Sequence, residues 1–163
     1  MPAVRTPVKF KEFQLKPIGG VVYAHDRRHS APVQVPTIMH PTRDGRENAR
    51  FPSFEAILGP GQMHECWVTC QDSTGRDHRF LIAAQYSEGA DVNLALKRVL
   101  PEVEWRGGLI VMRGGCHVFV VGMGGSVYRA LAEQAVRKYL IETAPLVIQA
   151  VQGGDELVLP TEL

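Results

Sequence analysis

The stretch HECWVTCQDSTGRDHRFLIAAQY, residues 64–86, holds the pattern that decides the fold. Two β-like runs, 64–70 and 78–86, are joined by the polar segment QDSTGRD, which contains one glycine. Two such runs around a polar turn predict a β-hairpin whose loop is longer than two residues. The protein is therefore expected to contain an antiparallel sheet.

A helix is predicted directly after this hairpin. Residues 89–101 carry apolar side chains near helical spacing, and Pro101 lies just past their end. Asp91 or Asn93 can cap the start of the helix, because their side chains accept hydrogen bonds from free backbone N–H groups.

The next forty residues repeat the order of a hairpin followed by a helix. Leu109–Met112 and His117–Val121 are predicted strands around an RGG turn, and residues 126–143 show the strongest helical pattern of the chain. The tail, residues 146–163, is expected to add one or two edge strands.

The predicted core comprises Trp67, Phe80, Leu81, Ile82, Leu109, Val111, Val118, Val120, Leu131 and Val136.

The order of these elements is ββαββα, which predicts an α+β fold: a mostly antiparallel sheet of hairpins with two helices. The length of 163 residues suits one domain, 1–163, with a packed α+β core over 62–163. Residues 1–61 are expected to be an extended, irregular and basic segment. Possible strands lie at 8–15 and 19–25, and proline-rich residues 30–52 predict a long loop or meander.

Charge is distributed unevenly although the net charge is +1. Residues 1–50 have a net charge of +5 and residues 51–163 a net charge of −4. A basic segment with interleaved aromatic rings suits a single-stranded nucleic acid, although a solvated loop has the same composition. The candidate nucleic-acid-binding residues are Lys9, Lys11, Lys16, Arg27, Arg28, Arg43, Arg46 and Arg50.

The N-terminal residues lack the apolar core of a secretory signal, and no apolar run approaches the ~18 residues of a membrane span. The three cysteines do not describe a disulfide scaffold. These features predict a reduced intracellular protein, cytoplasmic or nuclear, without contact to a membrane.

The glycine-rich loop Gly122–Gly125 precedes the second predicted helix. It resembles the start of a dinucleotide fingerprint, but Val127 stands where the third glycine is required. We expect a tight turn with Ser126 as the helix cap. The alternative is an anion bound at the helix N-terminus by Gly124, Gly125 and Ser126.

The candidate metal ligands are His64, Cys66 and Cys70, which lie even numbers of positions apart and so lie on the same face of the first predicted strand. No second close pair of ligands accompanies them, so buried core cysteines are the simpler interpretation, and no metal or other cofactor is predicted.

His25, Asp26 and His29 are the candidate catalytic residues. Two imidazoles and a carboxylate beside two arginines suit acid–base chemistry on a phosphodiester, although a charged turn has the same composition.

No catalytic pattern in the chain is specific. The sequence therefore favours a non-enzymatic interaction module that binds a protein or forms a homodimer, in part through edge strands. The first alternative is a nucleic-acid-binding protein that uses the basic N-terminal third. The second is a small hydrolase or nuclease.

Overall fold

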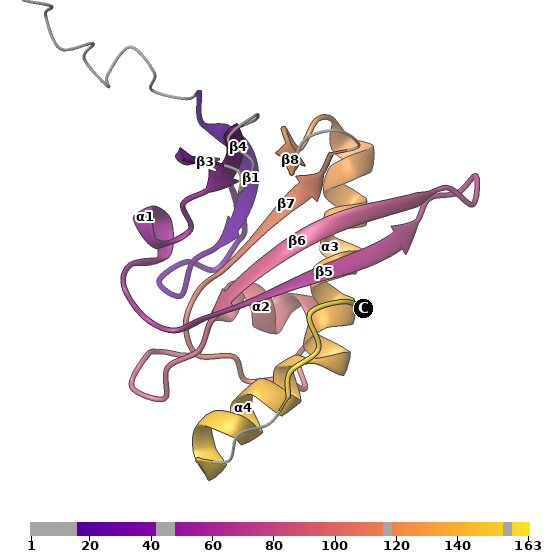
Figure 1. The fold of residues 1–163 in the computed structure, drawn as a ribbon. Helices are drawn as coiled ribbons and strands as arrows, with labels where there is room; N and C mark the ends of the chain where they lie inside the picture. The colour runs from indigo at the N-terminus through magenta and orange to yellow at the C-terminus, as the bar shows by residue number, and fades with distance from the viewer. Residues whose placement is uncertain (1–15, 42–47, 116–118, 155–157) are drawn as a thin grey trace, which may run out of the picture.

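A computed structural model describes residues 16–41, 48–115, 119–154 and 158–163. The strands are β1 (Ile18–Tyr23), β2 (Ala31–Val35), β3 (Thr37–Pro41), β4 (Asn48–Pro52), β5 (Met63–Gln71), β6 (Asp77–Gln85), β7 (Leu109–Gly114) and β8 (Val120–Val121). The helices are α1 (Glu55–Leu58), α2 (Leu94–Val99), α3 (Ser126–Glu142) and α4 (Ala144–Gly153). The arrangement is α+β, as the sequence predicts (Figure 1).

The main sheet has the strand order β2-β1-β7-β6-β5, and β8 pairs with the end of β7. Every pair of neighbouring strands in it is antiparallel. The β5–β6 hairpin has nine paired positions, from Met63↔Gln85 to Gln71↔Asp77. β7 lies between β1 and β6, so β1 and β2 belong to the same sheet as the later hairpins, whereas β3 and β4 form a separate two-stranded sheet.

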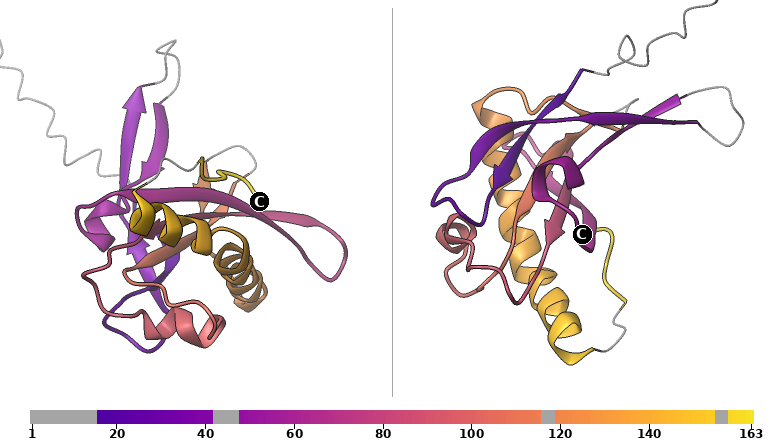
Figure 2. Two further views of the ribbon diagram at one scale, coloured as in Figure 1. Left: turned by 90° about the horizontal axis from the view of Figure 1, so that it is seen from below. Right: turned by 90° about the vertical axis from the view of Figure 1, so that its left-hand side faces the viewer.

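The two faces of the sheet have different covers. α2 and α3 lie on one face, and the small β3–β4 hairpin lies on the other (Figure 2). Because side chains alternate along a strand, neighbouring residues of β6 and β7 enter different cores. Phe80, Ile82, Leu109 and Val111 pack with α3. Leu81, Ala83, Ile110 and Met112 pack with Phe54 and with the partly buried Ile57 and Leu58 of α1.

The predicted core residues are buried with two exceptions. Val118 lies outside the described residues. Trp67 is partly buried and packs against the second core. Its ring lies on the sheet face opposite α3, where the Arg79 guanidinium stacks 4.5 Å from the ring centroid and Phe119 lies 5.2 Å away.

Part of the N-terminal third is regular: over residues 30–52, where a long loop or a meander is expected, the structure has strands. β1 confirms the predicted strand at 19–25, and β2, β3 and β4 follow it. The prolines are compatible with these strands because they occupy an edge strand and strand ends, where no ladder donor is needed. The predicted strand at 8–15 lies outside the described residues.

The tail corrects a second prediction, because residues 144–153 form α4 instead of an edge strand. Pro145 stands in the first turn, where its missing N–H costs nothing, and Gly154 ends the helix at φ 65°. The last residues do reach a sheet edge. Trp67 N–H donates to Thr161 O at 2.8 Å, and Leu163 N–H donates to Trp67 O at 2.8 Å. The last residues of the chain thus cover part of the β5 edge.

Candidate interaction surface around α4

α4 is an uncharged helix of ten residues, APLVIQAVQG, that continues the chain after α3. Pro145 separates the two helices, because it lacks the N–H that would extend the hydrogen-bond ladder of α3. Within α4 only Ala144 and Val147 are buried. Leu146 is 38% exposed and Val151 is 46% exposed. The helix therefore presents apolar side chains to solvent along most of its length.

The second half of α4 extends beyond the end of the sheet (Figure 1). Val147 and Val151 are four residues apart and so share one face of the helix. Val147 is 6% exposed, whereas Val151 is 46% exposed. The apolar face that buries Val147 against the core is thus partly exposed one turn later.

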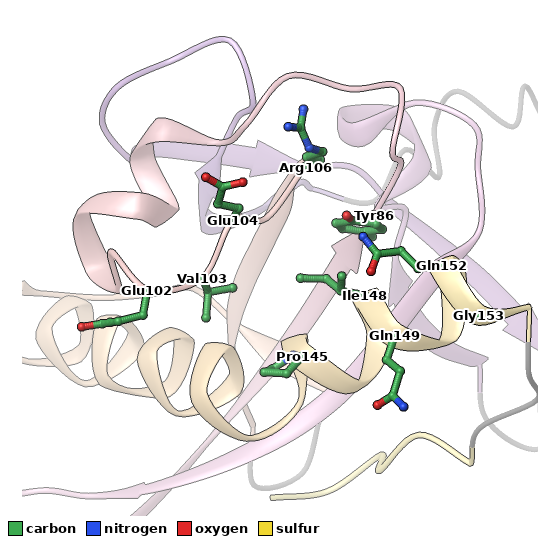
Figure 3. A pocket seen from close by; sticks show the side chains of 10 residues that line it. All are labelled: Tyr86, Glu102, Val103, Glu104, Arg106, Pro145, Ile148, Gln149, Gln152 and Gly153. Atoms are coloured by element: carbon green, nitrogen blue, oxygen red, sulfur yellow. The ribbon is translucent and has the colours of Figure 1, made fainter.

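A cavity of about 760 Å³ lies between α4 and the loops that follow β6 and α2. Figure 3 shows Ile148 and Gln152 on the side of α4 that faces this cavity, with Tyr86 opposite them. The far wall carries Glu102, Glu104 and Arg106. The α4 wall contains apolar and amide groups only, so the cavity has one neutral wall and one charged wall.

A second cavity of about 760 Å³ lies on the other flank of α4. Its lining mixes the apolar residues Met63, Ala84, Val147, Val151 and Leu159 with the polar residues Gln62 and His64, and Tyr86 borders both cavities. The two cavities and the exposed residues Leu146 and Val151 are called the α4 surface below.

His64 lines the second cavity and belongs to a polar pair beneath it. Tyr139 O–H lies 2.8 Å from His64 Nδ1, and Pro160 O lies 3.0 Å from Nε2. The carbonyl only accepts, so Nε2 carries the proton and Nδ1 accepts from the hydroxyl. The contact with the Tyr139 hydroxyl in this direction requires a neutral imidazole, whereas the contact of Nε2–H with Pro160 O is possible for either protonation state. Burial lowers the pKa of His64, and the bond to Pro160 opposes that shift in part.

The His64 pair predicts a loss of stability in mild acid. The pKa of His64 in the folded protein lies below its ordinary value of 6.5, so the unfolded chain takes up the proton more readily. The stabilisation is complete above pH 6.5 and is lost as the pH falls toward the folded pKa. We expect the urea midpoint of the unmodified chain to fall from neutral pH to about pH 5, and the fall to be smaller for His64→Gln. His29→Gln, at an exposed position, is the control and should retain the full fall; an equal fall in all three proteins would contradict this account.

The candidate metal ligands do not form a cluster. Cys66 and Cys70 are buried on the sheet face under α3, and His64 uses both ring nitrogens as described. Within the described ranges, no three His, Cys, Asp or Glu residues are grouped to hold a metal ion. Burial raises the pKa of Cys66 to about 11, which keeps the thiol protonated and disfavours a reactive thiolate.

The glycine loop corrects one detail of the sequence analysis. Gly125, not Ser126, is the N-cap of α3, and no side-chain hydrogen bond caps this helix. Gly124 has φ +80°, and its alpha carbon leaves room for the Arg113 guanidinium and the Tyr128 ring. The turn is therefore explained by local packing.

The candidate catalytic residues lie on the exposed loop between β1 and β2. His25 and Asp26 project from it, and His29 Nε2 lies 3.4 Å from Arg98 Nη1 of α2. Of the candidate nucleic-acid-binding residues, Arg27 and Arg28 share this loop. Lys16 precedes β1, and Arg50 lies in β4. Lys9, Lys11, Arg43 and Arg46 lie outside the described residues.

The comparisons with known proteins found no relative. The chain matches no protein-family model, and no match was found among curated proteins or solved structures. Among the residues that the structure describes, no helix combines the length and apolar character needed to cross a membrane.

Proposed function

We propose that this protein is a non-enzymatic interaction module that forms a homodimer through its α4 surface. The observation that carries the proposal is the exposed apolar character of α4: ten uncharged residues, of which only Ala144 and Val147 are buried. Apolar side chains gathered at one place on a surface mark an interaction site more often than scattered ones do.

A second copy of the chain suits this surface for two reasons. Two α4 helices can approach each other without like-charge repulsion, because neither carries a charge. A two-fold pair also brings each surface against the same surface of its partner. Leu146 and Val151 of one protomer would then meet the apolar lining of the other.

Charge at the margin supports the same arrangement. Glu102, Glu104 and Arg106 line the outer wall of the first cavity. In a two-fold pair the acidic residues of one protomer can face Arg106 of its partner, and the reverse contact forms by symmetry. These rim charges would set the orientation of the pair more than its affinity.

The sheet edges are weaker candidates for the contact. The C-terminal residues already pair with Trp67 and Thr69 of β5. The opposite edge strand, β2, contains Pro32, which has no N–H to offer to another strand. The dimer is therefore proposed through a helix and its grooves.

Light scattering over a range of concentrations tests the proposal. The unmodified chain should have the mass of a dimer that dissociates on dilution, and Leu146→Glu/Val151→Glu should be monomeric at every concentration, because each protomer would bury two carboxylates in the pair. Val127→Glu is the matched control, since Val127 is a 65% exposed apolar residue at the start of α3. It should remain a dimer.

Thermal unfolding of the same variants separates a lost interface from a lost fold. Leu146 and Val151 are exposed in one protomer, so the double variant at high dilution should unfold within a few degrees of the unmodified chain at the same dilution. A monomeric unmodified chain at all concentrations would refute self-association. A dimer that persists in the double variant would place the interface elsewhere.

A further inference from the structure

Basic side chains from two distant segments meet beside α2. Arg28 belongs to the loop between β1 and β2, and Lys97 and Arg98 belong to α2. Together with Leu94 they line a shallow depression of about 300 Å³. All four side chains belong to exposed residues, so an external ligand can reach them.

His29 and Arg98 join the two segments. Arg98 Nη1 donates toward His29 Nε2 at 3.4 Å. Because the imidazole accepts through Nε2, its neutral form carries the proton on Nδ1. The neutral imidazole leaves the charge of the Arg98 guanidinium uncompensated, so positive potential remains where the loop meets the helix.

Carboxylates compensate little of this charge. Lys97 Nζ lies 3.9 Å from Glu104 Oε1, a long and exposed ion pair. Within the part of the chain that the structure describes, the salt bridges include none of the guanidinium groups of Arg27, Arg28 or Arg98. Three guanidinium groups are thus available to an anion.

We propose that this basic cluster, Arg27, Arg28, His29, Lys97 and Arg98, binds the phosphate backbone of a nucleic acid. Guanidinium groups match phosphate oxygens in geometry as well as charge. The proposal does not depend on self-association through α4.

The form of the cluster favours an extended polyanion. Its four cations, Arg27, Arg28, Lys97 and Arg98, lie on an open surface, which suits several successive phosphates better than one small anion held in an enclosed pocket. A membrane surface would require several apolar anchors besides charge, and among the described residues Leu94 is the one apolar residue that lines the depression. Because none of these described lining residues is aromatic, binding should depend little on base sequence.

Fluorescence anisotropy with a labelled single-stranded RNA tests the proposal. Engagement of about three phosphates predicts a slope near −2 for log affinity against log salt concentration. Arg28→Glu and Arg98→Glu should each weaken binding by about tenfold. Arg76→Glu is the control with the same charge change, placed on the exposed turn between β5 and β6, and should bind within about twofold of the unmodified chain.

Three results would overturn the proposal. The first is no binding at about 50 mM salt, where phosphate contacts are strong. The second is an equal loss of RNA affinity in Arg28→Glu, Arg98→Glu and Arg76→Glu, which would show that binding responds to net charge alone. The third is binding of vesicles with anionic phospholipids that Arg28→Glu and Arg98→Glu weaken, without binding of RNA, which would assign the cluster to a membrane surface.

Discussion

Replacing Gly107 with alanine is expected to remove most of the stability of this fold, by about 4 kcal/mol or more. Gly107 has φ +117°, a conformation that L residues with a side chain rarely adopt, and a β-carbon there would collide with the carbonyl oxygen of Gln85. That carbonyl cannot withdraw freely, because it also accepts a hydrogen bond from Trp105 Nε1 at 3.2 Å. The fully buried Trp105 would have to move with it.

Gly75→Ala is the matched control for this prediction. Gly75 also has a positive φ, +82°, but a β-carbon at that position meets no atom within 4 Å. Gly75→Ala should lower the free energy of unfolding by about 1–2 kcal/mol, from backbone conformation alone. Urea unfolding of both variants measures how much more stability Gly107→Ala loses, and we attribute this difference to the collision with Gln85 O. Equal losses would show that the loop at Gly107 relaxes.

Asn93→Ala is expected to cost about 3–5 kcal/mol. The amide of Asn93 is fully buried and donates to Tyr23 O and to Gly107 O, each at 2.8 Å. Its Oδ1 accepts from Leu96 N–H at 3.0 Å and so caps α2. Alanine would leave two carbonyls and one N–H buried without a partner, at the point where β1, α2 and the start of β7 meet.

Asn93→Asp separates the cap from the rest of this role. At an exposed helix start, aspartate and asparagine are equally good caps. Here, however, aspartate would replace the donating amide with an oxygen that faces the carbonyl oxygens of Tyr23 and Gly107. We expect a loss at neutral pH at least as large as that of alanine, with partial recovery in acid, where the protonated carboxyl can donate. Asp91→Ala, at the exposed alternative cap, should cost less than about 0.5 kcal/mol. A small loss in the free energy of unfolding for either Asn93 variant would contradict the proposed role of the amide.

Local patterns predicted most of the packed core. β5, β6 and α3 follow from alternation and helical periodicity within a few residues, and Asn93 was one of two caps that the sequence offered. The insertion of β7 between β1 and β6 was not predictable in this way, because it depends on which strands meet across long sequence separations.

The candidate sites were less predictable than the core. The apolar run 146–151 is compatible with either a strand or a helix, because short apolar runs carry no decisive period. Pro145 before it and Gly153 and Gly154 after it were the available signals for a helix. The basic cluster joins residues 27–29 to residues 97–98, and no local pattern indicates that these segments meet.

Hydrogen exchange at two protein concentrations tests the central claim, self-association through α4, most directly. Amides at an interface are protected only in the assembled state. We predict that backbone amides of α4 exchange faster when the protein is diluted from about 100 μM to about 1 μM, a range that spans the dissociation of a micromolar dimer, while amides of β6 and β7 in the core keep their rates. The account would be contradicted if the amides of α4 exchanged at identical rates at both concentrations while light scattering gave the mass of a monomer.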